Sequence, residues 1–142
     1  MTDVSFYFNV ADRSDYICRL TRKATRQGAR VVLSGPAPML THYDRCLWTF
    51  EDVEFLAHQV LAPHQTSADA AAVQVWLTQD PAQCAHREVL VNLGDQPPAG
   101  YRDYARLIEV VSRDEADRTA ARQRWKYYAS QGDTIERFEV GG

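Results

Sequence analysis

The beginning of the chain alternates between strand and helix patterns, and this alternation restricts the fold more than any other feature of the sequence. Residues 4–10, VSFYFNV, carry β-branched and aromatic side chains on both faces, as in a buried parallel strand. After the turn-forming ADRSD, either Asp12 or Ser14 can cap a helix that ends near Gln27, and RVVLS at 30–34 is a second strand. A strand, a helix and a strand within about thirty residues form a βαβ unit. We therefore predict an α/β fold, a three-layer Rossmann-like domain with a mainly parallel central sheet.

The first helix is predicted to be amphipathic. Its core face contains Ile17, Leu20 and Ala24. Its predicted solvent-exposed face consists of four basic residues, which are Arg19, Arg22, Lys23 and Arg26. The simplest interpretation of such a row is a solvated surface.

The rest of the chain continues the alternation. Residues 48–70 show no clear period, so we predict that this stretch is irregular and partly exposed. GDQPPAG is predicted to be a loop, and at most one helical turn follows it. The other predicted elements are a helix at 40–47, strands at 73–77, 88–93 and 107–111, a helix that follows Ser112 and ends before Gly132, and an edge strand at 135–140.

Length and charge limit the classes of protein that the chain can belong to. A chain of 142 residues with 45% hydrophobic and 25% charged residues fits one domain, which we expect to span residues 1–142. A formal net charge of −3 disfavours a protein whose main role is to bind the phosphate backbone, because that role normally needs a clustered cationic excess. A local basic patch remains compatible with this charge.

The sequence contains no clear signature of a metal site, a cofactor site or an export signal. Its cysteines are odd in number and widely spaced, which favours a reducing cytoplasm, and no stretch is apolar enough to span a membrane. His58 and His64 could share a metal with Asp52 or Glu54, but lone histidines more often satisfy local hydrogen bonds. Neither a G-x-G-x-x-G nor a P-loop motif occurs. We expect no catalytic residue, no metal and no cofactor.

The last predicted helix has the most informative side-chain pattern. Arg118, Arg122 and Lys126 recur every four residues and form a cationic stripe beside an aromatic one that includes Trp125 and Tyr128. Guanidinium groups pair with carboxylates and an aromatic wall can bury a side chain, so this surface suits an acidic peptide with an apolar end. The alternative is an ordinary amphipathic helix, with its aromatic residues in the core and its arginines in water.

Seven motifs, taken in order, give the chain a resemblance over nearly its full length to the chi subunit of bacterial DNA polymerase III holoenzyme. In this family proline usually precedes the histidine of FLAH, where this sequence has Ala57, and leucine is usual at Tyr43. The motifs are FYF at 6–8, LTRKATRQGARVVL at 20–33, YDRCLWTF at 43–50, FLAH at 55–58, VLVNL at 89–93, RLIEVVS at 106–112 and ARQRWKYYASQG at 121–132.

The resemblance implies a cytoplasmic adaptor with two faces, which is not an enzyme by itself but part of an assembly with DNA-directed DNA polymerase activity. One face would bind the psi subunit of the clamp loader, through Trp48 and Phe55, although both residues could instead be ordinary core. The other face would bind the acidic, phenylalanine-ended C-terminal tail of single-stranded DNA-binding protein, so contact with DNA would be indirect. The residues predicted for this tail site are Val111, Arg122, Trp125, Lys126 and Tyr128.

Two functions from other classes remain as alternatives. The first is a Rossmann-like nucleotide-binding enzyme, whose ligand would lie near Gly35. The second is a direct single-stranded DNA binder that would use Arg118, Arg122 and Trp125 for backbone contacts and stacking.

Overall fold

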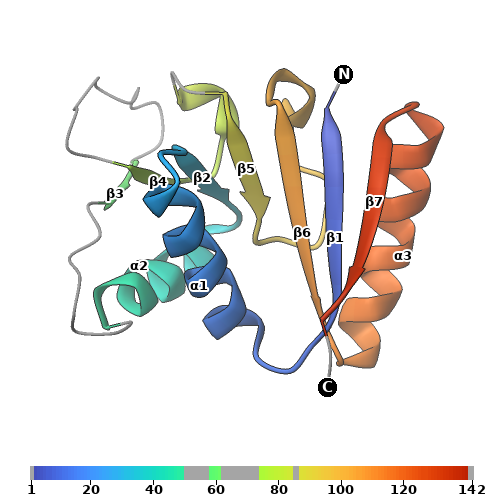
Figure 1. Cartoon of the computed structure of the whole chain (residues 1–142), viewed down its shortest axis with the longest axis horizontal. Coiled ribbons are helices and arrows are strands. Elements are labelled where there is room, and N and C mark those ends of the chain that lie inside the picture. Colours follow the sequence, from blue (N-terminus) through green and yellow to red (C-terminus); the bar gives the residue numbers. More distant parts are fainter. Residues whose placement is uncertain (1, 50–57, 62–73, 85–86, 141–142) are drawn as a thin grey trace.

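A parallel β-sheet runs through the molecule, with helices packed against both of its faces (Figure 1). The structure is a computed structural model, and it describes residues 2–49, 58–61, 74–84 and 87–140. Within these residues the sheet has seven strands in the order β3-β4-β2-β5-β6-β1-β7, and every pair of neighbours is parallel. The strands are β1 (Asp3–Val10), β2 (Val31–Ser34), β3 (His58–Val60), β4 (Val75–Thr78), β5 (Val89–Asn92), β6 (Arg106–Ser112) and β7 (Thr134–Glu139).

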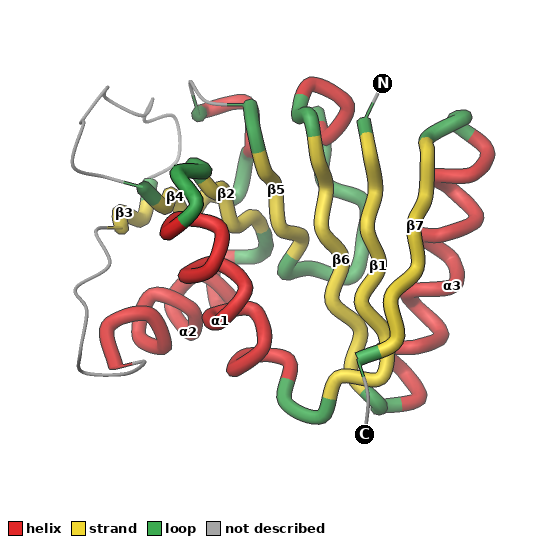
Figure 2. Tube along the Cα trace, in the orientation of Figure 1, coloured by secondary structure: helices red, strands yellow, loops and turns green. Residues whose placement is uncertain are grey.

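The helices divide between the two faces of the sheet, which confirms the predicted three-layer α/β fold (Figure 2). Helices α1 (Arg13–Arg26) and α2 (Ala37–Thr49) pack on one face, over a core cluster that includes Ile17, Tyr43 and Leu77. Helix α3 (Glu115–Ser130) packs on the other face, over a second cluster. Two short 3-10 turns, Pro81–Gln83 and Tyr101–Asp103, connect strands. Among the described residues, no helix combines the length and apolarity needed to cross a membrane.

The first βαβ unit forms as predicted. Asp12 caps α1, because its side chain accepts a hydrogen bond from the backbone N–H of Asp15 at 3.1 Å. The helix ends in a turn at Gly28, whose φ of +90° suits glycine. One detail of the prediction is wrong: Arg22 is only 5% exposed. The buried arc of α1 is wider than expected because α1 packs beside α2 as well as against the sheet.

The two edges of the sheet were predicted with different success. The edge strand near the C-terminus is confirmed as β7, which pairs with β1. At the opposite edge, the stretch expected to be irregular contains β3, a strand of three residues that pairs with β4. A strand this short has too few side chains to show an alternating pattern, so the sequence could not reveal it. Residues 50–57 and 62–70 of that stretch lie outside the described residues.

Candidate functional site

Helix α3 begins with a cap that fixes its position on β6. The side chain of Asp114 accepts a hydrogen bond from the backbone N–H of Asp117 at 3.2 Å. The carboxylate of Asp117 reaches back and accepts from the backbone N–H of Ser112, the last residue of β6, at 2.8 Å. These acidic groups lie where the positive end of the helix dipole favours them. The strand and the helix are therefore held together at the point where the chain passes from one to the other.

A hollow of about 330 Å³ lies between α3 and the edge of the sheet formed by β1 and β7. We call it the α3 hollow. Three of the five predicted tail-site residues line it, and three further residues complete it. Its lining consists of Phe8, Arg118, Arg122, Trp125, Lys126 and Arg137.

Two half-buried aromatic rings, Phe8 and Trp125, form the apolar part of the α3 hollow. Their ring centroids lie 6.2 Å apart, and Trp125 also packs against the buried ring of Phe6 at 5.0 Å. The guanidinium carbon of Arg137 lies 4.7 Å from the centroid of Phe8, within cation–π distance. The hollow therefore joins an aromatic floor to a cationic rim.

All the charged groups that line the α3 hollow are positive. Arg118 lies 3.9 Å from the carboxylate of Glu115, and Arg137 pairs with Glu139 at 2.5 Å. Arg122 and Lys126 are exposed and make no ion pair with any described residue. Like charges gathered beside an aromatic surface repel one another, so a bound anion would lower their electrostatic energy.

The prediction needs correction at Val111 and Tyr128. Both side chains are 0% exposed and belong to the core cluster beneath α3, so neither offers surface to a ligand. Tyr128 donates a hydrogen bond from its hydroxyl to the carboxylate of Glu109 at 2.5 Å. For Tyr128, the alternative of ordinary core packing is therefore the one the structure supports.

Beneath α3, on the side of the helix that faces β5 and β6, lies a buried polar network that the sequence interpretation missed. Glu109, in the middle of β6, pairs with Arg124 at 3.1 Å, and both side chains are almost fully buried. Asn92 also donates to Glu109 at 3.0 Å, while Arg124 donates to the backbone carbonyl of Asp95 at 3.1 Å. Burial raises the pKa of Glu109, and the charge of Arg124 opposes that shift. Burial and then the neighbouring carboxylate raise the pKa of Tyr128. This network fixes the rotation of α3 on the sheet, and with it the outward direction of Arg122.

The turn near Gly35 does not resemble a phosphate-binding turn. A Cβ atom at this position would lie 2.9 Å from the Cβ of Leu93, so the space beside the glycine is filled by the chain itself. Within the described ranges, no three histidine, cysteine, aspartate or glutamate side chains gather in a possible metal site. Phe55 and the side chains of Trp48 and of the His58 and His64 pair lie outside the described residues.

Fold and surface together define a Rossmann-like α/β protein with an open hollow lined by cationic and aromatic side chains. Where a nucleotide-binding protein would hold phosphate, the turn at Gly35 is filled by the chain itself. The family model of the DNA polymerase III chi subunit, HolC, matches residues 1–136, and the chain belongs to this family. The chain is 33% identical over 141 residues to the DNA polymerase III subunit chi of Pseudomonas aeruginosa, covering 96% of this chain and 95% of that protein. It is also 28% identical over 125 residues to the protein of the same name from Haemophilus influenzae, covering 87% and 85% of the two chains.

Proposed function

We propose that this protein is a non-catalytic accessory subunit that connects the clamp loader, through the psi subunit, to the acidic C-terminal tail of single-stranded DNA-binding protein. Membership of the chi family supports the place in the replicative polymerase. The observation that carries the tail assignment is the α3 hollow, in which every charged lining residue is positive and two aromatic rings form the floor. The protein would reach DNA only through the tail.

An acidic tail with a terminal phenylalanine matches the positive charge and the aromatic side chains of the α3 hollow. Its terminal ring would lie against Phe8 and Trp125, which are half-buried and already in contact with each other. Its carboxylates would pair with Arg122 and Lys126, which make no ion pair with any described residue. Several weak tail contacts on one coated strand would add through avidity.

A titration with free tail peptide tests this function. We expect an acidic peptide that ends in phenylalanine to bind, and the same peptide without that residue to bind at least about tenfold more weakly, because the aromatic floor then loses its partner. Raising the salt from about 0.05 M to about 0.5 M should weaken binding by a further factor of about ten, since the rim is exposed to solvent. Equal affinity for both peptides, or stronger binding to naked single-stranded DNA than to coated DNA, would contradict the proposal.

The psi face is proposed at Trp48, near the end of α2, and at Phe55, which follows α2 in the sequence. Trp48 lies in the last turn of α2, which packs on the face of the sheet opposite to the α3 hollow. The two partners would therefore approach from different sides of the molecule.

We expect Trp48→Ala to weaken co-purification with psi by at least about tenfold, because tryptophan residues dominate interface energetics, and to leave tail binding unchanged. Loss of the fold in this variant would show that Trp48 is a core residue instead.

A further inference from the structure

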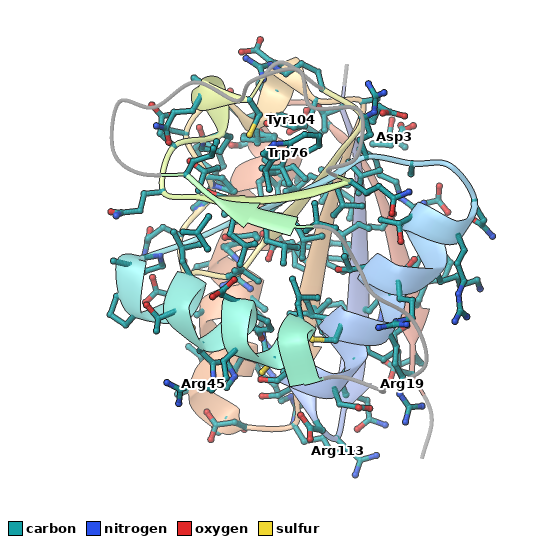
Figure 3. The ribbon with its side chains drawn as sticks, turned by 90° about the vertical axis from the view of Figure 1, so that its left-hand side faces the viewer. Asp3, Arg19, Arg45, Trp76, Tyr104 and Arg113 are labelled. Carbon is teal, nitrogen blue, oxygen red and sulfur yellow. The ribbon has the colours of Figure 1, made fainter. Side chains whose placement is uncertain are left out.

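A second hollow lies on the other face of the sheet, between α1 and the strands β1, β5 and β6. It has a volume of about 440 Å³, and we call it the α1 hollow. Figure 3 shows Arg19, one of its lining residues, on the outer side of α1. The residues that line it are Tyr7, Tyr16, Arg19, Leu20, Lys23, Ala24, Gln27, Val89, Arg106 and Ile108.

The charged residues that line the α1 hollow are Arg19, Lys23 and Arg106, and all of them are positive. Helix α1 carries five basic side chains and one acidic side chain, in a chain whose formal net charge is −3. The helix dipole explains a basic residue in the last turn of α1, but it does not explain an arginine on the facing strand. Arg19, Lys23 and Arg106 therefore give this hollow a positive lining in a chain that is negative overall.

One of these cations is held in place by the sheet. Arg106 donates hydrogen bonds to the hydroxyl of Tyr7 at 3.0 Å and to the hydroxyl of Ser5 at 3.4 Å. Arg19 pairs with Asp15 at 2.9 Å, but both side chains are exposed, so solvent screens this pair. Lys23 is exposed and makes no ion pair with any described residue. The hollow thus presents to an anion the oriented guanidinium of Arg106 and the two exposed cationic side chains of Arg19 and Lys23.

Between the cations the wall combines aliphatic side chains with the rings of Tyr7 and Tyr16. Leu20, Val89 and Ile108 line the inside of the hollow. The ring of Tyr7 already contacts two other rings, Phe138, which is stacked at 4.9 Å, and Tyr16, which is tilted at 5.7 Å. A nucleic-acid base needs an open ring face on which to stack, and the stacked Phe138 ring occupies one face of Tyr7.

We propose that the α1 hollow binds an acidic peptide segment of a partner protein, with the carboxylates on Arg19, Lys23 and Arg106 and one aliphatic side chain against Leu20 and Ile108. A nucleotide is a poor match, because Val89 and Arg106 are the first residues of β5 and β6, whereas α/β proteins bind nucleotides at the carboxyl ends of their strands. This site lies on the opposite face from the α3 hollow and does not depend on the function proposed for that hollow.

Nuclear magnetic resonance of the ¹⁵N-labelled protein provides the test. The probe is a short blocked peptide of aspartates around one leucine, compared with the same peptide carrying glycine in place of leucine. We expect amide shifts at Ala24, Gln27 and Val89, with at least about tenfold weaker binding of the glycine peptide. Lys23→Glu should weaken binding of the leucine peptide by about tenfold or more, because it reverses one charge of the hollow.

Two matched variants separate this site from general attraction to positive charge. Arg45 is an exposed arginine of α2 that Figure 3 shows far to one side of Arg19, and Arg45→Ala should leave the shifts at Ala24 and Val89 unchanged. Arg122→Ala, in the α3 hollow, should also leave them unchanged.

Three results would overturn the proposal. The first is the absence of shifts at Ala24, Gln27 and Val89 when the peptide is in large excess. The second is an equal loss of binding in Lys23→Glu and Arg45→Ala, which would indicate charge attraction without a site. The third is tighter binding of oligothymidylate than of the peptide at these same amides, which would identify the site as one for nucleic acid.

Discussion

Glu109→Gln is expected to lower the free energy of unfolding by about 3–5 kcal/mol, because it leaves Arg124 as a buried charge without its counter-ion. The two side chains are 0% and 1% exposed, so water cannot take the place of the lost carboxylate. Arginine keeps its proton under all ordinary conditions, so Arg124 cannot relieve the cost by becoming neutral. Urea unfolding of the parent and the variant measures the difference.

The reciprocal change, Arg124→Met, should cost less because Glu109 can take up a proton. Burial already raises the pKa of Glu109 and Arg124 opposes the shift, so removal of Arg124 raises this pKa further. A carboxyl group whose pKa is higher in the folded state than in the unfolded state favours folding at low pH and loses that contribution as the pH rises. Arg124→Met should therefore be more stable near pH 5 than near pH 8, relative to the parent.

The double variant provides the control for this pair. Glu109→Gln combined with Arg124→Met should cost less than the sum of the two single changes, because no buried charge is left unpaired. Strict additivity of the two costs, or a cost of Glu109→Gln below about 1 kcal/mol, would show that the pair does not stabilise the fold.

Arg122→Ala should weaken binding of the tail peptide by about 2 kcal/mol, or about 30-fold, while the melting temperature stays close to that of the parent. The side chain is exposed and makes no ion pair with any described residue, so its removal costs the fold little. Arg122→Glu should have the larger effect, because it places a like charge against the acidic tail. Calorimetric titration gives the affinity, and thermal unfolding shows whether the fold is preserved.

Arg45→Ala is the matched control, since it also removes an exposed arginine but from a helix on the opposite face of the sheet. Its tail affinity should equal that of the parent. If Arg122→Ala also bound the tail with unchanged affinity, the anchor would have to lie elsewhere on the molecule. Lys23→Glu, in the α1 hollow, should leave the affinity of the α3 hollow for the tail unchanged.

The sequence was sufficient for most of the fold, because βαβ units leave strong local patterns. Apolar strands and a helix cap at Asp12 or Ser14 are local signals; the strands are confirmed, and the structure shows that Asp12 is the cap. The three-residue strand β3 depends on pairing with β4, which is a long-range interaction that local patterns do not encode. The buried face of α1 was similarly underestimated, since its packing against α2 is a tertiary contact that local patterns do not show.

The candidate site was predicted only in part, for a related reason. Helical spacing identified Arg122, Trp125 and Lys126 correctly as neighbours, and the structure places them around one hollow. Spacing could not show that Phe8 and Arg137 come from two strands at the sheet edge to complete it. A signal for the buried network was present in the sequence, since Glu109 is a single acidic residue within an apolar strand pattern and so needs a buried partner.

The pairing of β7 with β1 makes the α3 hollow a joint product of both ends of the chain. Phe8 comes from β1 and Arg137 from β7, which are far apart in the sequence, and the pair meets only when β7 docks beside β1. A nascent chain that has completed α3 already contains the helix with its arginine row and the Glu109 network. It still lacks the wall that β7 contributes. Recognition through this hollow would thus be acquired only after β7 has been synthesised, when strands β1 to β6 are already available to fold.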